Sequence, residues 1–182
     1  MSERVEHVDE NDQVLGVVER EEAVRKRWPH RVAATFCRDP AGRILVVRRA
    51  RTLARFPGYY DVTVGGAVDV GESYEAAAGR ELAEELGVGA PVRFLFKFLC
   101  RGGVSPYWLG AHEALVPTAV LPDPAVIDWW DWMTMADLLD VVDEWGFTPG
   151  GREALHRYVT SGPGRGPGPR DGDGEEKRPA RQ

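Results

Sequence analysis

Cysteine is scarce in this chain, since only Cys37 and Cys100 occur among 182 residues. Two cysteines do not build a disulfide framework, and this pair lacks the spacing of metal ligands. Each lies in an apolar stretch, so we expect two buried thiols in the core. Such cysteine usage is typical of a reducing compartment, and we expect the chain to be cytoplasmic.

Long apolar runs are also missing from the sequence. No run approaches the ~18 residues that a membrane-spanning helix requires. The polar start, from Met1 to Arg4, does not have the apolar stretch of a secretory leader. We therefore expect no membrane partner.

Several motifs of other enzyme classes do not occur: the phosphate-binding P-loop, the dinucleotide-binding glycine fingerprint and the nucleophile elbow of serine hydrolases. The formal net charge of −6 at pH 7 disfavours nonspecific binding to nucleic acid polymers. We expect a small-molecule substrate instead. An anionic substrate would need local cations, from a metal and from arginines, to approach an acidic protein.

The length of the chain corresponds to one domain with appendages, and a hydrophobic share of 43% is enough for a core. We expect residues 1–29 to form a hairpin and a short helix within the fold, and residues 30–160 to form the main domain. Residues 161–182 are dense in Gly and Pro and lack apolar anchors, which predicts a disordered tail.

Strand and helix patterns alternate along the chain. They predict a hairpin over 5–18, a helix over 20–27, a helix from Thr134 to about 142 and another from Thr148 to about 158. The predicted strands are 31–38, 43–49, 62–64, 92–99, 107–116 and 127–133. This interleaving favours an α/β fold with a mixed sheet between helical layers.

The most informative stretch is 66–88, which reads GAVDVGESYEAAAGRELAEELGV. We expect a loop, a helix and a second loop, with Gly65, Gly66 and Gly71 in tight turns. Ser73 is the expected N-cap of the helix, and Gly87 is its expected stop.

Three carboxylates share one face of this predicted helix. With roughly 100° between successive residues, Glu81, Glu84 and Glu85 fall within one narrow arc, while Leu82 and Leu86 point away toward a core. Like charges so close repel one another, and a hard divalent cation removes the repulsion. Ligands that are all oxygens favour Mg²⁺, with Mn²⁺ as a substitute. An ordinary solvated, Glu-rich helix face is the alternative interpretation.

The stretch matches the Nudix box, G-x5-E-x7-R-E-U-x-E-E-x-G-U with U aliphatic, at every specified position. The chain therefore resembles the Nudix hydrolases, and this resemblance implies an α/β/α sandwich with a Nudix domain over 30–160. It implies hydrolysis of a phosphoanhydride in a nucleoside diphosphate linked to another moiety, or in a related diphosphate. Glu81, Glu84 and Glu85 would hold the metal, and Glu81 or Glu84 would prepare the attacking water.

The resemblance also assigns structural roles within the box. Glu72 and Arg80 are expected to pair and to fix the loop against the helix, and Gly87 to end the helix. The backbone at Gly65 and Gly66 is expected to shape the metal and phosphate site. A ligand-binding regulatory module that keeps the box without turnover is the alternative function.

Short pieces outside the box resemble the branch around type I isopentenyl diphosphate isomerase. These pieces are residues 8–12, 15–16, 30–31, 49–50, 56–58 and 147–149. The isomerase needs a cysteine and a metal-binding histidine at positions that here are Gly65 and Ala67, and glycine has no proton to give. Its later Glu-x-Glu pair is reduced to Glu113. We therefore expect a hydrolase, with the isomerase as a less favoured alternative.

In that branch, the region after the second strand contacts the diphosphate. Arg49 matches such a contact, whereas the lysine expected at position 53 is Leu53; Arg48, Arg51 and Arg55 lie close by. Weaker candidates for metal, substrate or catalytic roles are His30, Glu113, Asp128 and Asp131.

Three tryptophans occur on one predicted strand, where neighbouring side chains point to opposite faces. Trp130 and Trp132 are predicted to be in the core. Trp129 is predicted to be a base-stacking surface or a contact in a homodimer.

Overall fold

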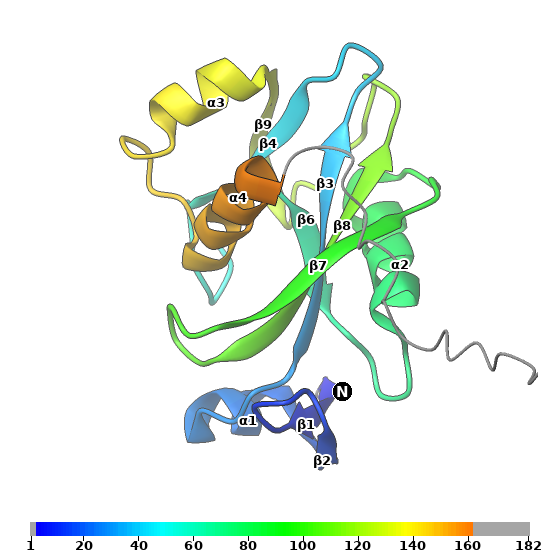
Figure 1. Cartoon of the computed structure of the whole chain (residues 1–182), viewed down its shortest axis with the longest axis vertical. Helices are drawn as coiled ribbons and strands as arrows, with labels where there is room; N and C mark the ends of the chain where they lie inside the picture. The colour runs from blue at the N-terminus through cyan, green and yellow to red at the C-terminus, as the bar shows by residue number, and fades with distance from the viewer. Residues whose placement is uncertain (1–2, 162–182) are drawn as a thin grey trace, which may run out of the picture.

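The structure, a computed structural model, describes residues 3–161 (Figure 1). The predicted disordered tail lies outside the described residues, apart from Ser161. The elements are β1 (Arg4–Val8), β2 (Val14–Glu19), α1 (Arg20–Lys26), β3 (Arg31–Arg38), β4 (Ile44–Arg49), β5 (Tyr60–Asp61), β6 (Val64–Ala67), α2 (Tyr74–Leu86), β7 (Arg93–Cys100), β8 (Tyr107–Leu115), β9 (Ile127–Met133), α3 (Met135–Val141) and α4 (Pro149–Ser161). No helix among residues 3–161 is both long enough and apolar enough to cross a membrane.

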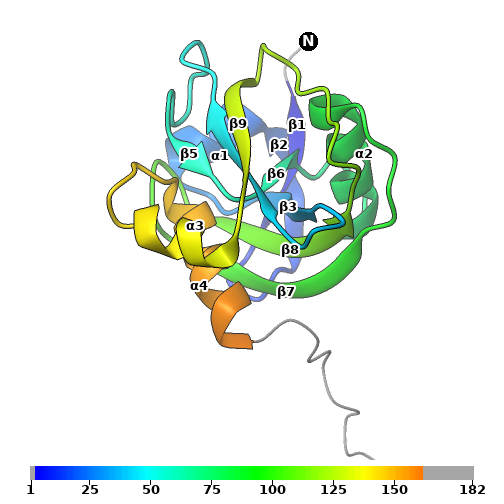
Figure 2. The same cartoon turned by 90° about the horizontal axis from the view of Figure 1, so that it is seen from above.

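A mixed sheet of seven strands forms the centre of the molecule. Its main order is β5-β4-β3-β8-β7, with β6 paired to β3 and β9 paired to β4. Strand β3 runs parallel to β8 and antiparallel to β6, so it joins the two halves of the sheet. Helix α2 covers one face, and α3 and α4 cover the other (Figures 1 and 2). The predicted α/β/α sandwich is confirmed.

Both faces of β3 are buried because helices cover both sides of the sheet. Phe36 belongs to the core on the α4 side, with Leu138 and Leu155, whereas Cys37 belongs to the core on the α2 side, with Leu82. Neighbouring residues of a strand point to opposite faces. This explains why the strand is apolar without alternation. The predicted buried thiols, Cys37 and Cys100, are both in the core.

The strand predicted over 62–64 is wrong in its bounds. The chain instead forms β5, then passes through Val62 and Thr63, and then forms β6. Gly65 and Gly66, predicted to lie in a turn, are inside β6 and face Ala34 and Ala33 of β3. A strand so rich in glycine has little strand propensity, and its pairing with β3 decides its conformation. Gly71 does lie in a turn, with φ 77°.

The tryptophans of β9 differ in part from the prediction. Trp132 is buried, as predicted, and its Nε1 donates to the carbonyl of Thr118 at 2.9 Å. Trp130, however, is 36% exposed. Trp129, predicted at the surface, is half-buried against the rings of Tyr60 and Trp145. The helices α3 and α4 cover the face on which Trp129 points, and a strand pattern alone does not reveal which face is covered.

Strands β1 and β2 form a separate hairpin that Arg31 ties to the sheet. The Arg31 guanidinium donates to Asp12 at 2.6 Å and to Glu6 at 2.8 Å. The same Asp12 carboxylate accepts from Tyr74 at the start of α2, and Glu6 accepts from the backbone of Gly71. The N-terminal segment is therefore anchored next to the loop and helix of the box.

Candidate active site

Helix α2 presents its carboxylates because both of its ends are fixed by capping. Ser73 Oγ accepts from the backbone N–H of Ala76 at 3.1 Å, and Gly87 closes the helix with φ 66°. Both caps agree with the prediction. Leu82 and Leu86 are fully buried on the sheet side, which fixes the rotation of the helix about its axis.

The three carboxylates of the box differ in environment. Glu81 and Glu85 line a cavity of about 310 Å³, and Glu85 Oε2 accepts from the backbone N–H of Gly65 at 3.2 Å. Burial, and then the charge of Glu81, raise the pKa of Glu85 to about 8. Burial also raises the pKa of Glu81. Glu84 has a side chain that is 59% exposed and lies outside the cavity lining.

Arg80 connects the carboxylates of this region. It donates to both oxygens of Glu72, at 3.1 and 2.9 Å, so the predicted pair is present. One of its amino groups, Nη1, bridges Glu81 at 2.7 Å and Glu84 at 3.3 Å, while Nη2 donates to the carbonyl of Ala67 at 3.0 Å. One guanidinium thus joins the loop, β6 and α2.

Gly65 and Gly66 bring β6 close to both neighbours. A Cβ on Gly65 would lie 2.0 Å from the Ala33 carbonyl oxygen of β3, and its φ of 154° disfavours other residues. A Cβ on Gly66 would lie 2.4 Å from Glu81 Oε1. The first glycine permits the strand pairing, and the second leaves the space that the Glu81 carboxylate fills.

The donor set of this region fits a hard divalent cation. Carboxylate oxygens are the ligands that Mg²⁺ and Mn²⁺ prefer, and a cation beside Glu85 would favour its charged form. Among residues 3–161, no three His, Cys, Asp or Glu side chains stand together as a ready-made metal site. Arg80 Nη1 lies between Glu81 and Glu84, so an ion held by all three carboxylates would take over that bridging role.

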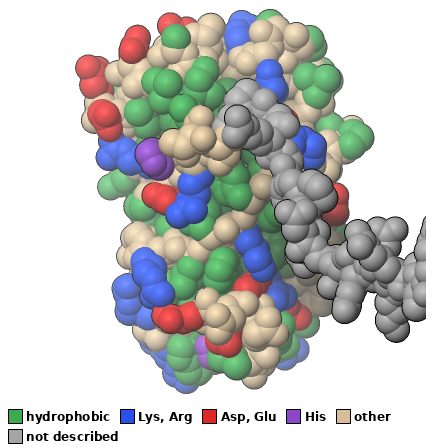
Figure 3. Space-filling view, viewed as in Figure 1, with side chains coloured by type: hydrophobic (Ala, Val, Ile, Leu, Met, Phe, Trp, Pro, Cys, Tyr) green, Lys and Arg blue, Asp and Glu red, His purple; other side chains and the backbone are tan. Residues whose placement is uncertain are grey.

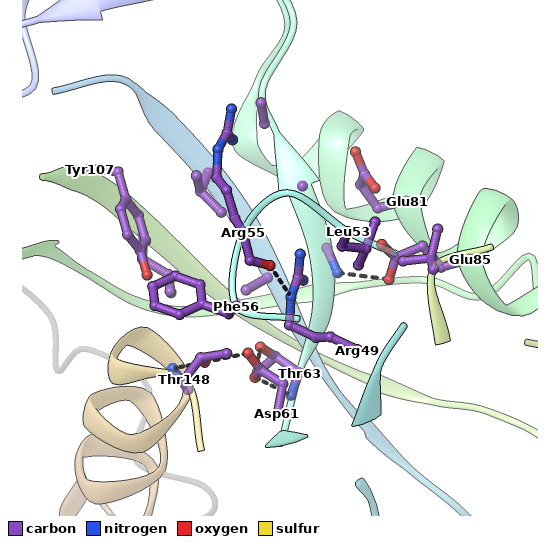
Figure 4. Close-up of a pocket in the computed structure, with 18 of the residues that line it drawn as sticks. Arg49, Leu53, Arg55, Phe56, Asp61, Thr63, Glu81, Glu85, Tyr107 and Thr148 are labelled. Atoms are coloured by element: carbon purple, nitrogen blue, oxygen red, sulfur yellow. Dashed lines mark hydrogen bonds between the residues drawn. The ribbon is translucent and has the colours of Figure 1, made fainter. Parts of the chain in front are cut away.

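Arginines line the cavity across from the carboxylates. Figure 4 shows Arg49 and Arg55 between Glu81 and Glu85 on one side and the rings of Phe56 and Tyr107 on the other. Arg49 Nε donates to the backbone carbonyl of Arg55 at 3.2 Å, which ties the Arg49 side chain to the loop that carries Arg55.

Arg49, predicted to bind the substrate, lines the cavity, and so does Arg55, which was not among the predicted site residues. Burial, together with the nearby charge of Arg20, lowers the pKa of Arg55 from its usual value. Leu53, the position where a lysine was expected, also lines the cavity. Arg55 therefore supplies a positive charge to the part of the cavity where Leu53 stands at the position of the expected lysine.

Asp61 is a cavity residue that no sequence signal indicated. Its carboxylate accepts from Thr63, through both the backbone N–H and the hydroxyl, and from the hydroxyl of Thr148. Burial raises its pKa. Thr148 Oγ1 also accepts from the N–H of Gly151, so Asp61 connects the cavity wall to the start of α4.

His30 lies at the cavity and is only 3% exposed. Its Nδ1 has no hydrogen-bond partner within residues 3–161. Burial lowers its pKa to about 4. The imidazole is therefore neutral near pH 7.

The other acidic candidates lie away from the cavity lining. Glu113 accepts from the hydroxyl of Tyr158 at 2.5 Å and from Arg93 at 2.7 Å. Asp128 pairs with Arg48 at 2.6 Å. The carboxylate of Asp131 accepts from the backbone next to it. In the structure these three side chains interact with other groups, away from the cavity lining.

Comparisons with known proteins agree with this arrangement. The family model of the Nudix domain matches residues 28–158. An uncharacterized Nudix hydrolase of Streptomyces coelicolor is 41% identical over 164 residues, which cover 88% of this chain and 91% of that protein. A prenyl-diphosphate phosphatase of Methanosarcina mazei is 29% identical, over 87% of this chain and 96% of that protein.

A solved structure from Deinococcus radiodurans is similar across the same span. It is 30% identical, with a TM-score of 0.74, and the alignment covers 85% of this chain and 98% of that one. The chain belongs to the Nudix family and is an enzyme that acts on pyrophosphate bonds.

Proposed function

We propose that this enzyme hydrolyses a phosphoanhydride bond with the help of a divalent metal. The substrate is a nucleoside diphosphate linked to another moiety, or a related diphosphate. Mg²⁺ is the expected ion, with Mn²⁺ as a substitute. The Methanosarcina mazei relative, named for prenyl diphosphates, puts that class among the related diphosphates to be tested.

The observation that carries the proposal is that acidic and basic side chains face each other across one cavity. Glu81 and Glu85 lie on α2, and Arg49 and Arg55 lie across from them. A diphosphate has the charges to use both walls, because its oxygens bind guanidinium groups directly and carboxylates through a cation. In a partly buried cavity such interactions are stronger than in water.

In this proposal each residue has a distinct task. Glu81, Glu84 and Glu85 hold the ion, and Gly65 orients Glu85 through its N–H. Arg49 and Arg55 hold phosphate oxygens and stabilise the charge that moves to the leaving group. Glu81 or Glu84 accepts the proton of the attacking water. A bound Mg²⁺ supplies polarisation of the phosphorus centre and a water of lowered pKa.

A substrate panel tests the proposal. Purified enzyme is incubated with nucleoside diphosphate sugars, ADP-ribose, nucleoside diphosphates and prenyl diphosphates, with Mg²⁺, with Mn²⁺ and with a chelator. We expect metal-dependent release of a phosphorylated product from at least one class. Binding of a panel compound without any release would instead favour the non-catalytic regulatory module.

Isomerisation of isopentenyl diphosphate is the less favoured alternative. The position of the protonating cysteine is Gly65, whose space is filled by the backbone of β3, and no side chain there supplies a proton. Incubation with isopentenyl diphosphate in deuterated water would reveal isomerisation through deuterium in the allylic product.

The expected partners follow from the same charges. On the face drawn in Figure 3, basic and acidic side chains are interspersed with apolar ones, so this face offers no continuous basic field for a nucleic acid. We propose a small-molecule substrate and a cytoplasmic location. A homodimer is a further proposal, which sedimentation equilibrium would test.

A further inference from the structure

The first described residue of the chain reaches the candidate active site. Glu3 directly precedes β1 and Arg20 directly follows β2, and both line the cavity. Arg20 Nη1 donates to the two carboxylate oxygens of Glu3 at 2.9 and 2.7 Å. The backbone N–H of Arg20 also donates to the Glu3 carbonyl at 2.8 Å. The two side chains are therefore held together at the cavity edge.

This ion pair is the exception among the arginines that line the cavity. Arg20, Arg49 and Arg55 all line the cavity. Among residues 3–161, Glu3 is the only carboxylate that forms an ion pair with any of these three arginines. Arginines that lie together without partners repel one another, and an anion relieves this repulsion.

Two buried polar atoms at the same cavity lack partners. Arg20 Nε and His30 Nδ1 are both inaccessible to solvent and make no hydrogen bond within residues 3–161. Leaving a buried polar atom unpaired costs about 1–3 kcal/mol. Arg20 is the first residue of α1, and His30 lies between α1 and β3.

We infer that Glu3 is an internal anion that occupies Arg20 in the free enzyme, and that a phosphate group of the substrate displaces it. Arg20 is then a substrate-binding residue that the N-terminal hairpin brings to the site. This inference rests on the proposed function, because it assigns how the diphosphate is held.

The geometry allows such an exchange. The Glu3 side chain is 45% exposed, against 22% for Arg20, so Glu3 can turn toward solvent without disturbing the core. A phosphate carries more charge than one carboxylate and offers more acceptor oxygens to the guanidinium fork. Arg4 in β1 and Glu19 in β2 are neighbours in the strand ladder, and this backbone pairing keeps Glu3 near Arg20 after the exchange. Glu3 should therefore weaken binding by competition.

Calorimetry with methylenediphosphonate, which cannot be hydrolysed at its bridging carbon, tests the exchange in the full-length chain. Arg20→Gln should weaken binding by about tenfold or more, as loss of a charge-assisted contact predicts. Glu3→Gln should tighten binding about threefold to tenfold, since it removes the competitor. In the Arg20→Gln background, Glu3→Gln should change affinity less than about twofold, which is the signature of coupling.

Matched controls separate this exchange from general electrostatics. Arg25→Gln and Glu19→Gln remove the same charges from exposed positions of the same segment, and each should change affinity less than about twofold. Wild-type affinity in Arg20→Gln would overturn the inference. So would a Glu3→Gln gain that persists without Arg20.

Two further measurements cover the cases in which Arg20→Gln does not fold or the proposed function is wrong. If Arg20→Gln does not fold, as judged by circular dichroism, Arg20→Lys retains the charge and should weaken binding less, and the gain in Glu3→Gln still tests the inference. The substrate panel with wild-type enzyme tests the proposed function separately. Turnover of a diphosphate together with an unaltered affinity in Arg20→Gln would reject only the inference.

Discussion

At the scale of single residues, two adjacent glycines have different tasks. Gly65 lies against backbone atoms of β3, which cannot move away without breaking the sheet. Gly66 lies against the carboxylate of Glu81, the free end of a side chain. The same substitution at these positions should therefore affect different properties of the enzyme.

We expect Gly65→Ala to lower the free energy of unfolding by about 3 kcal/mol or more, as steric strain in a core predicts. Gly66→Ala should cost less than about 1.5 kcal/mol, but it should reduce metal-dependent turnover about tenfold or more because Glu81 is displaced. Urea unfolding and steady-state assays on both variants check this pair. Equal losses of stability would contradict it.

His30 should make stability depend on pH. Its pKa is about 4 in the folded protein because of burial, against an ordinary value of 6.5. Between these values only the unfolded chain takes up the proton. The stability contribution is therefore complete above pH 6.5 and is lost as the pH falls toward 4. Each pH unit within this window lowers the free energy of unfolding by about 1.4 kcal/mol, and the whole window lowers it by about 3 kcal/mol.

Urea unfolding at pH 7.5 and pH 4.5 measures this effect. The loss of stability on acidification should be about 2–3 kcal/mol smaller in His30→Gln than in the wild type. His156→Gln, which changes an exposed histidine of α4, should leave the loss within about 0.5 kcal/mol of wild type. The same loss in His30→Gln and wild type would show that His30 is not buried in its neutral form.

At the scale of elements, the sequence predicted the helices and most strands well. Caps and apolar periodicity are local signals, and they placed α2 within its observed bounds from Tyr74 to Leu86. The prediction failed at β6, whose glycines carry no strand signal and owe their conformation to pairing with β3. It failed again at Trp130, since which side of β9 is covered depends on helices distant in sequence.

The N-terminal hairpin is an element whose position depends on Arg31. Arg31→Met would leave Asp12 paired with Lys97 alone and would also break the pair with Glu6, which should lower the free energy of unfolding by about 2 kcal/mol or more. Arg93→Met, which breaks a more exposed pair with Glu113, should cost less than about 1 kcal/mol. Urea unfolding compares the two variants.

Hydrogen exchange gives a second test of this anchoring. The amides of β1 and β2 should exchange faster in Arg31→Met than in the wild type, because the hairpin has lost two of its ion pairs to the sheet. The exchange rates of the amides of β3 and β8 should change only as much as the change in global stability predicts. Equal stability of the Arg31 and Arg93 variants would contradict the role assigned to Arg31.

At the scale of the whole molecule, the cavity is assembled from segments that are far apart in the chain. Glu81, Glu84 and Glu85 were predicted as site residues because they belong to one continuous motif, and Glu81 and Glu85 line the cavity whereas Glu84 does not. Arg20, Arg55 and Asp61 were not predicted as site residues, because only the folded sheet brings them to the same cavity. A motif encodes the residues within one element, whereas the opposite wall depends on topology.

The measurement that tests the central claim most directly is the Mg²⁺-dependent turnover of Glu85→Gln beside that of wild type. The substrate is whichever diphosphate the panel identifies. The change keeps the shape of the side chain and removes its charge, so we expect a folded protein with the thermal stability of wild type or higher. Its turnover should fall at least about a hundredfold, the scale on which single stabilising groups act. Turnover within about threefold of wild type, in a folded variant, would contradict a metal held by Glu85.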